Sequence, residues 1–392
     1  MIDFDYYAPT KVVFGKNTEE RVGALVKAEN CKKVLVHFGG ESAKKSGLLD
    51  RVFASLKEAG VEFIQLGGVK PNPRLSLVQE GIALCKKEGV DFILAVGGGS
   101  VIDSAKAIAI GTLSKRDVWD YFEGKAEPEA SLPVGCVLTI AAAGSETSNS
   151  MVITNEEIGS KRGVTSNFGI CRFAIMNPQL TLTLPAYQTS AGIADIIMHT
   201  LERYFTPENP MEITDNIAEA LLRTVIANGR TLTRNPKSYA ARAEIMWAGS
   251  LSHNGLTGCG GGAGDWSCHQ LGHQLSAKYD LAHGASLAAV WGSWARYVCN
   301  ENPDRFAQLA ENVLEVEPSD NIDKMAKEGI EEMEGFFWAM EMPTSISEAG
   351  IELSEEDLKE LATQCSFGGT RSIGAFKELN QEDILKIYTM AR

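Results

Sequence analysis

Short apolar runs alternate with longer amphipathic stretches over the first part of the chain. β-Branched and aromatic residues dominate the short runs, and apolar residues recur at helical spacing between them. The runs predict strands at residues 33–38, 61–66, 91–96, 133–140 and 173–176, and helices at 48–60, 75–88 and 101–108. Apolar strands that alternate with helices are typical of βαβ units, in which a parallel sheet is covered on both faces.

The pattern changes after Leu184-Pro185, where long helical segments replace the strand-like runs. Residues 217–231, 239–252 and 321–338 have the spacing of amphipathic helices, and few alternating β-branched runs lie among them. The chain is also long enough for two domains. We therefore predict an α/β domain at residues 1–185 and an all-helical domain at residues 186–392.

The composition argues against several classes of partner. The 392 residues carry a formal net charge of −14 at pH 7, which disfavours nucleic acid and anionic membranes. No stretch approaches the roughly 20 apolar residues of a membrane span, and the N-terminus lacks the features of a signal peptide. Eight scattered cysteines without a Cys-x-x-Cys pair predict reduced thiols. We expect a cytoplasmic protein that acts on a small molecule.

Two glycine-rich turns follow predicted strands. The first consists of Gly97, Gly98, Gly99 and Ser100, and a helical run follows it. Exposed amides at a helix N-terminus carry partial positive charge, so this turn would suit a pyrophosphate. Its spacing matches neither Gly-x-Gly-x-x-Gly nor a P-loop. A tight turn without a ligand is the alternative interpretation.

The second turn bears on the choice of cofactor. It consists of Gly39, Gly40, Glu41 and Ser42, with Lys44 and Lys45 close behind. Small residues, a hydroxyl and two lysines would accommodate and pair a 2′-phosphate, which favours NADP(H) over NAD(H). Glu41 could instead accept hydrogen bonds from the ribose, as acids do in NAD-selective folds. A solvated lysine pair without a ligand is also consistent with this pattern.

Histidines and one aspartate form a pattern suited to a metal ion. Asp195 and His199 are four residues apart, which places both on one face of a helix. His269, His273 and His283 follow later in the chain. On a continuous helix His269 and His283 would lie about 21 Å apart, so a shared ion requires a break between them.

The spacing leaves the ligand set open. His269 and His273 form a competing His-x-x-x-His pair, and Asp195 and His199 alone could simply hydrogen-bond to each other. Three neutral imidazoles and one carboxylate would suit one divalent metal, Fe²⁺ or Zn²⁺.

Taken together, these segments resemble the iron-dependent (group III) alcohol dehydrogenase family over nearly the whole chain. Within that family the chain is most similar to the NADPH-dependent butanol dehydrogenases and broad-range aldehyde reductases. The resemblance is carried by Phe14-Gly15, residues 97–106, Gly144-Ser145-Glu146, Lys161, Gly192 to His199, residues 264–273 and His283-Gly284. The glycine motif is modestly specific, whereas the ordered aspartate and histidine motifs are highly specific in combination.

The resemblance implies a role for each site residue. The implied metal ligands are Asp195, His199, His269 and His283, and His273 would be a catalytic residue near the nicotinamide that relays a proton or positions the ring. The implied cofactor contacts are Gly39, Gly40, Ser42 and Lys45 near the adenosine ribose, Gly98, Gly99 and Ser100 at the pyrophosphate, and Asp103, Thr139, Ser145 and Lys161 elsewhere. Many relatives carry more hydroxyls between positions 139 and 145, so only Thr139 and Ser145 transfer from that segment.

The predicted function is metal-dependent interconversion of primary alcohols and aldehydes by hydride transfer with NADP(H). The α/β domain would be a Rossmann-like dinucleotide-binding domain, the helical domain would bind the metal, and the active site would lie in the cleft between them. The resemblance also implies a homodimer.

Two alternative functions come from other classes. A lyase resembling dehydroquinate synthase would need lysines and arginines for a polyanionic substrate. Trp247, Leu251, Trp266 and Leu271 flank the metal region instead, which favours a small apolar substrate. A non-catalytic metal-binding protein would leave both glycine turns unexplained.

Overall fold

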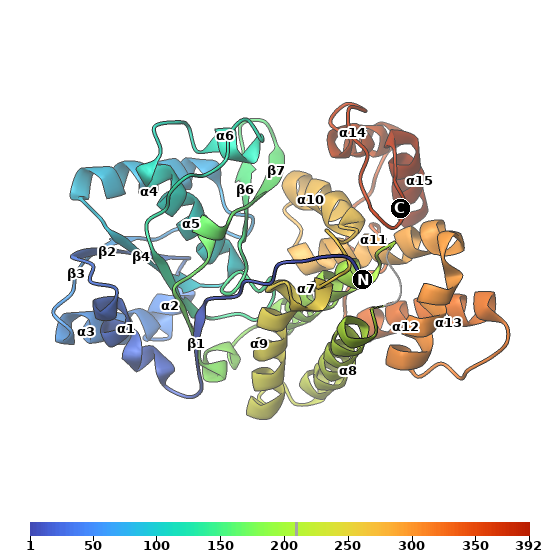
Figure 1. Cartoon of the computed structure of the whole chain (residues 1–392), viewed down its shortest axis with the longest axis horizontal. Helices are drawn as coiled ribbons and strands as arrows, with labels where there is room; N and C mark the ends of the chain where they lie inside the picture. Colours follow the sequence, from blue (N-terminus) through green and yellow to red (C-terminus); the bar gives the residue numbers. More distant parts are fainter. Residues whose placement is uncertain (208–210) are drawn as a thin grey trace. The chain divides into compact units, whose positions relative to one another are not determined.

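The computed structural model describes residues 1–207 and 211–392 (Figure 1). The chain forms two compact units, one of residues 8–184 and one of residues 1–7 together with 185–392. The sequence analysis places the first seven residues in the α/β domain, whereas in the structure they group with the helical unit. The backbone N–H of Ile2 donates to the carbonyl of Gly260 at 2.9 Å, which ties the N-terminal segment to the helical unit.

Six parallel strands form the main sheet of the α/β unit, in the spatial order β1-β8-β5-β4-β2-β3. They are β1 (Lys11–Phe14), β2 (Lys33–Phe38), β3 (Glu62–Leu66), β4 (Phe92–Gly97), β5 (Val134–Leu138) and β8 (Phe173–Met176). The central strands β4 and β5 are buried along their whole length, as expected for a sheet covered on both faces. The predicted α/β class is confirmed.

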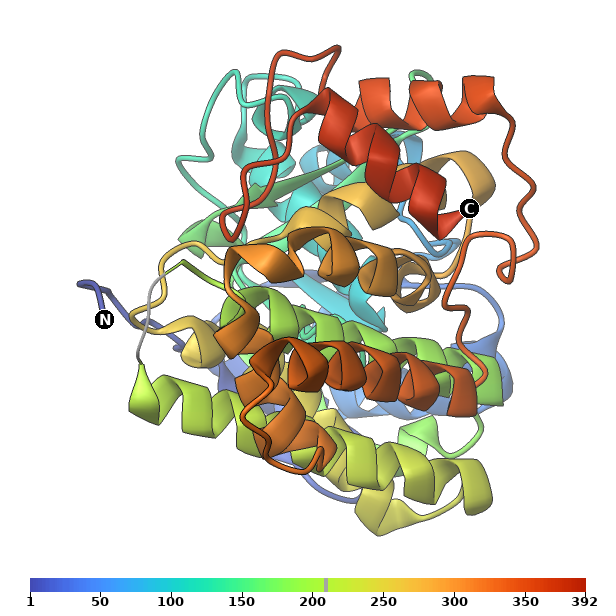
Figure 2. The same cartoon turned by 90° about the vertical axis from the view of Figure 1, so that its right-hand side faces the viewer.

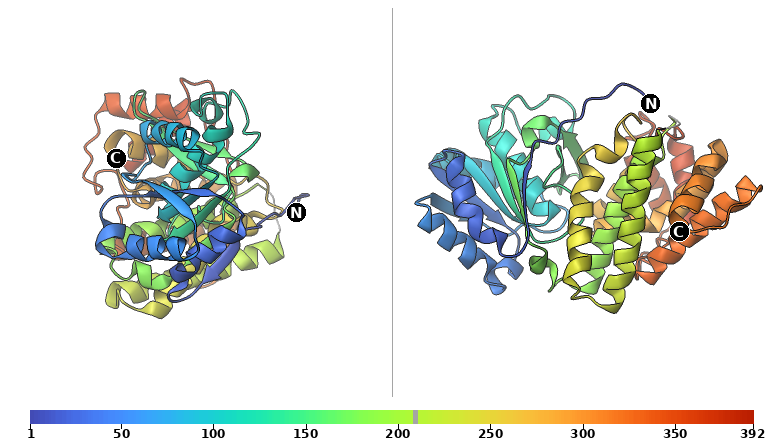
Figure 3. Two further views of the ribbon diagram at one scale, coloured as in Figure 1. Left: turned by 90° about the vertical axis from the view of Figure 1, so that its left-hand side faces the viewer. Right: turned by 60° about the horizontal axis from the view of Figure 1, so that its bottom comes forward.

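Helices cover both faces of this sheet (Figures 1 and 3). The helices of this unit are α1 (Val22–Ala28), α2 (Ser42–Lys45), α3 (Leu48–Glu58), α4 (Leu75–Glu88), α5 (Gly99–Leu113) and α6 (Trp119–Phe122). Val34 and Val36 of β2 share a buried cluster with apolar residues of α1 and α3. His37, between Val36 and Phe38, hydrogen-bonds to Ser104 of α5. Because successive side chains of a strand point to opposite faces, α5 covers the face of the sheet opposite to α1 and α3.

Two strands outside the main sheet were not predicted. β6 (Ser150–Asn155) and β7 (Ser160–Thr165) form an antiparallel hairpin. β7 reads Ser-Lys-Arg-Gly-Val-Thr, which has no apolar alternation that would reveal a strand. The four-residue strand β1 was missed as well, because it is short and only one of its residues is buried.

The second unit consists of helices around the buried helix α7 (Ala186–Tyr204). Its other long helices are α8 (Glu212–Arg234), α9 (Tyr239–His253), α10 (Ser267–Tyr279), α11 (His283–Val298), α12 (Pro303–Leu314), α13 (Ile322–Ala339), α14 (Glu355–Cys365) and α15 (Gln381–Ala391). Helix α7 packs against α8, α9 and α11 (Figure 3), and α14 packs against α15 near the C-terminus (Figure 2). The predicted helices fall on α8, α9 and α13. Across the described residues, no helix combines the length and apolar character needed to cross a bilayer.

The buried His37 predicts a pH dependence of stability. Its ring nitrogens lie 2.9 Å from the carbonyl of Leu66 and 2.9 Å from the hydroxyl of Ser104. Burial lowers the pKa of His37 from 6.5 to about 4, because the charged ring would lose its hydration. The unfolded chain therefore binds this proton more readily than the folded one. Stability should fall as the pH drops from about 6.5 to about 4, by up to about 3 kcal/mol from this group.

The variant His37→Asn isolates this contribution, because carboxylates that also titrate in this range are common to both proteins. Denaturation midpoints measured between pH 4 and pH 7 should fall less steeply for His37→Asn than for the unmodified chain. Parallel profiles for the two proteins would show that His37 does not titrate as described.

Candidate metal centre and cofactor turns

One face of helix α7 carries the first part of the candidate metal centre. Asp195 and His199 are one helical turn apart, and both are buried. The Nδ1 atom of His199 lies 3.3 Å from Oδ1 of Asp195. The intervening apolar residues bury the helix, so the two polar side chains point at each other instead of at water.

A break between two helices brings in the remaining histidines. Helix α10 ends at Tyr279, and Asp280 adopts a left-handed conformation with φ of 53°. Helix α11 then begins at His283. The two helices are therefore interrupted between His269 and His283, as is necessary for both side chains to reach one ion.

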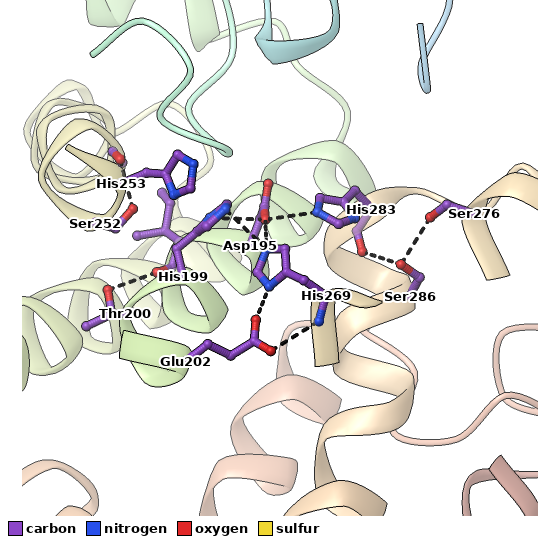
Figure 4. Close-up of polar contacts among 12 residues, drawn as sticks. Asp195, His199, Thr200, Glu202, Ser252, His253, His269, Ser276, His283 and Ser286 are labelled. Carbon is purple, nitrogen blue, oxygen red and sulfur yellow. Dashed lines mark hydrogen bonds and ion pairs between the residues drawn. The ribbon is translucent and has the colours of Figure 1, made fainter. Parts of the chain in front are cut away.

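Four side chains converge as a result (Figure 4). The Nε2 atom of His269 lies 3.1 Å from Nε2 of His199 and 3.9 Å from Oδ1 of Asp195. The Nε2 atom of His283 lies 3.8 Å from the same carboxylate oxygen. Among the described residues, Asp195, His199 and His269 each offer one donor atom within 4.8 Å of the others.

The donor atoms fit a divalent cation. A tetrahedral site with metal–donor distances of about 2.0–2.2 Å has donor–donor separations of about 3.3–3.6 Å. With Nε2 as the donor atom of each histidine, the separation between His199 and His269 is 3.1 Å, and Oδ1 of Asp195 lies 3.9 Å from His269 and 3.8 Å from His283, which are values close to that range. Burial is the main cause that lowers the pKa of His199 well below its usual value, so this imidazole is neutral and keeps a lone pair for a ligand bond.

His273 lies beside this cluster. Its ring centroid is 5.3 Å from that of His283 and 6.2 Å from that of His269, and the ring is perpendicular to His269. The side chain is buried. His273, the second histidine of the competing His-x-x-x-His pair, is thus adjacent to the candidate ligands His269 and His283.

Two residues of this region were missed in the sequence. Glu202 continues the stripe of Asp195 and His199 on α7, and its carboxylate contacts His269 (Figure 4). The spacing Asp-x-x-x-His-x-x-Glu could have revealed it, because positions i, i+4 and i+7 share one helix face. His253 at the end of α9 has its ring centroid 4.0 Å from that of His199. No local spacing connects His253 to the other histidines.

The apolar residues named beside the metal region differ in their surroundings. Trp266 lies edge-on to His269, with ring centroids 5.1 Å apart, and the guanidinium of Arg203 stacks on it at 4.5 Å. Trp247 is exposed, whereas Leu271 is fully buried in the core. Trp266 therefore lies against the candidate ligands His199 and His269.

The first glycine turn lies at the carboxyl end of β4, where ligands of open parallel sheets bind. Gly97 ends the strand and α5 begins at Gly99, followed by Ser100. A Cβ atom on Gly98 would lie 2.1 Å from Cγ2 of Ile140, so only glycine permits this close approach. A Cβ atom on Gly99 would meet Oγ of Ser145 at 3.3 Å, and the N–H of Thr139 donates to the carbonyl of Gly97 at 3.0 Å.

Other predicted cofactor residues make contacts within the protein. Oδ2 of Asp103, on α5, accepts a hydrogen bond from the backbone of Val152 at 3.0 Å. The ammonium of Lys161, on β7, donates to Oδ1 of Asn72 at 2.9 Å. Both residues therefore hold the hairpin β6–β7 in place within the α/β unit.

The second glycine turn follows β2, the neighbour of β4 in the sheet. A Cβ atom on Gly39 would lie 3.8 Å from Val101 of α5, so the two turns are close to each other. Ser42 begins the short helix α2, which ends at Lys45. The exposed carboxylate of Glu41 lies 3.3 Å from the ammonium of Lys44. Gly40 has no atom within 4 Å of its missing Cβ, so it leaves open space at the turn.

Comparison with known proteins identifies the family. The model "Iron-containing alcohol dehydrogenase" matches residues 9–178, and "Fe-containing alcohol dehydrogenase family, C-terminal" matches residues 189–392. The chain is 40% identical to the probable NADH-dependent butanol dehydrogenase 1 of Bacillus subtilis, over 99% of both chains. It is 34% identical to the NADPH-dependent aldehyde reductase YqhD of Escherichia coli, over 100% of both.

A solved structure agrees with these matches. The NADH-dependent butanol dehydrogenase A from Thermotoga maritima superposes with a TM-score of 0.96 at 39% identity, covering 100% of this chain and 99% of that chain. Because the matches extend over almost the whole sequence and fold, the chain belongs to the iron-containing alcohol dehydrogenase family.

Proposed function

We propose that the chain is a metal-dependent oxidoreductase that interconverts small primary alcohols and aldehydes, of the size of butanol and butanal, with NADP(H). The observation that carries this proposal is the convergence of one carboxylate and three imidazoles from α7, α10 and α11. Relatives named as butanol dehydrogenases and an aldehyde reductase support the reaction. The family match does not favour the dehydroquinate-synthase-like lyase.

Each group of residues has a proposed role in this reaction. Asp195, His199, His269 and His283 would hold Fe²⁺ or Zn²⁺, which when bound supplies a Lewis acid for the substrate oxygen. The amides of the turn Gly98 to Ser100 would hold the pyrophosphate of the cofactor, whose nicotinamide supplies the hydride chemistry. His273 would hold or pass a proton beside the histidine cluster, since its ring lies 5.3 Å from His283.

Butanal-dependent oxidation of NADPH tests the proposal. We expect this activity in the purified protein, its loss on removal of the metal with a chelator, and its return when Fe²⁺ or Zn²⁺ is added. A protein shown by elemental analysis to be metal-free that still reduces butanal would contradict the metal-dependent reaction.

We further propose that NADPH binds at least about tenfold more tightly than NADH. Ser42 and Lys45 lie on the turn after β2, where they could pair a 2′-phosphate, and Lys44 partly neutralises Glu41. Relatives carry both NADH-dependent and NADPH-dependent names, so the preference needs a direct measurement. Dissociation constants from cofactor fluorescence would provide it. Equal affinities would assign Glu41 to the ribose hydroxyls instead.

A homodimer is proposed on the basis of the N-terminal segment. Ile2, Phe4, Tyr6 and Tyr7 expose their apolar side chains next to one another in the sequence. Apolar side chains that remain exposed in one segment could be covered by a second copy of the chain, as apolar patches at protein–protein interfaces are. Light scattering should give twice the chain mass of 42.4 kDa, and a monomer at micromolar concentration would contradict the proposal.

A further inference from the structure

Glu202 is a buried carboxylate next to the candidate metal ligand His269. It lies on α7, seven residues after Asp195 and three after His199, so all three side chains share one face of the helix. Only 1% of its surface is exposed. A carboxylate removed from water to this extent is costly unless polar groups of the protein satisfy it.

Both carboxylate oxygens of Glu202 contact the same residue. Oε1 accepts a hydrogen bond from the backbone N–H of His269 at 3.1 Å, and Oε2 contacts the ring atom Nδ1 of His269 (Figure 4). The carbonyl of Glu202 also accepts from the backbone N–H of Asp265 at 2.7 Å. Glu202 therefore fixes the start of helix α10 and the orientation of the His269 ring at the same time.

The contact at Nδ1 determines which nitrogen of His269 remains available. A carboxylate accepts hydrogen bonds, so the ring proton lies on Nδ1, and Nε2 keeps its lone pair. Nε2 is the atom that faces Asp195 at 3.9 Å and His199 at 3.1 Å. A carboxylate paired with a ligating histidine in this way orients the ring and increases its basicity.

We propose that Glu202 is a positioning residue that fixes the tautomer and orientation of His269 and thereby sets the affinity of the site for its divalent cation. The inference rests on the metal site of the proposed function. In this positioning role Glu202 contacts His269 and need not touch the substrate, the cofactor or the cation.

Glu219 offers a matched control in the same unit. It lies on α8, only 2% of its surface is exposed, and its Oε1 accepts a hydrogen bond from the hydroxyl of Tyr204 at 2.9 Å. Gln308 and Asn312 donate to the same oxygen at 2.9 and 3.1 Å. Glu219 is thus a buried, hydrogen-bonded carboxylate whose contacts lie outside the histidine cluster.

The test is a competition titration of the metal-free full chain with Co²⁺ against a chromophoric chelator. Glu202→Gln keeps the shape of the side chain but removes its charge, and we expect it to bind Co²⁺ about 10- to 100-fold more weakly. Glu202→Ala should lose at least as much. The visible absorption spectrum of bound Co²⁺ should also change in Glu202→Gln, because it reports the ligand geometry. Glu219→Gln should retain both the affinity and the spectrum of the unmodified protein.

Each outcome decides between the possible explanations. Unchanged Co²⁺ affinity in Glu202→Gln overturns the inference, and so does an equal loss in Glu219→Gln, which would indicate general loosening of the unit. If Glu202→Ala does not fold, Glu202→Gln still provides the test. The proposed metal site itself fails if the unmodified chain binds no Co²⁺, or if Asp195→Ala binds it equally well. If Asp195→Ala loses Co²⁺ binding while Glu202→Gln keeps the affinity of the unmodified chain, only the role of Glu202 is overturned.

Discussion

Replacement of Asp195 by alanine is expected to reduce turnover of butanal by at least about a thousandfold, while NADPH binding persists. Oδ1 of Asp195 lies 3.3 Å from His199, 3.9 Å from His269 and 3.8 Å from His283. The carboxylate thus supplies the negative charge at the centre of three imidazoles. Without it, the three imidazoles alone would hold a divalent cation weakly, and the substrate oxygen would lose its electrophilic partner.

The persistence of cofactor binding follows from the division of the chain. Asp195 belongs to the helical unit, whereas both glycine turns belong to the α/β unit. The measurements are kcat/KM with butanal, the dissociation constant of NADPH and the metal content of the same preparation. Asp304→Ala, which removes an exposed aspartate of α12, is the control and should leave all three unchanged. An Asp195→Ala protein that keeps its metal but loses NADPH would contradict this division of roles.

The core of the fold could be predicted from the sequence because its signals are local. Residues 92–97 form an uninterrupted buried run, and such a run between helical stretches identifies a central parallel strand. The hairpin β6–β7 could not be predicted, since Lys161 and Arg162 occupy a strand whose register depends on its partner. Tertiary pairing, and not local sequence, makes that segment extended.

The candidate site shows the same limit. The pair Asp195 and His199 can be identified from helical spacing, whereas the meeting of His269 with His283 depends on a chain reversal at Asp280 that spacing does not specify. The prediction that His269 and His283 bind the same ion therefore came from the resemblance to the family. His253 approaches His199 only because α9 packs against α7, and no motif in the sequence encodes that packing.

Gly284→Ala is expected to destabilise the helical unit by about 3 kcal/mol or more and to weaken metal binding at least about tenfold. A Cβ atom at this position would lie 1.8 Å from the carbonyl oxygen of Ala191 and 3.1 Å from the backbone nitrogen of Asp195. Both atoms belong to the backbone of α7, so no side-chain rotation can relieve the overlap. Helix α11 would have to move away from α7 and carry the adjacent His283 with it.

Gly335→Ala is the matched control, because it makes the same change inside helix α13 where no atom lies within 4 Å of the added Cβ. We expect this variant to be stabilised by about 0.5–1 kcal/mol, since alanine restricts the unfolded chain more than glycine does. Thermal midpoints and Co²⁺ titrations of both variants provide the comparison. If Gly284→Ala melts at the temperature of the unmodified protein and binds Co²⁺ equally well, then close contact between α7 and α11 does not hold His283 beside Asp195.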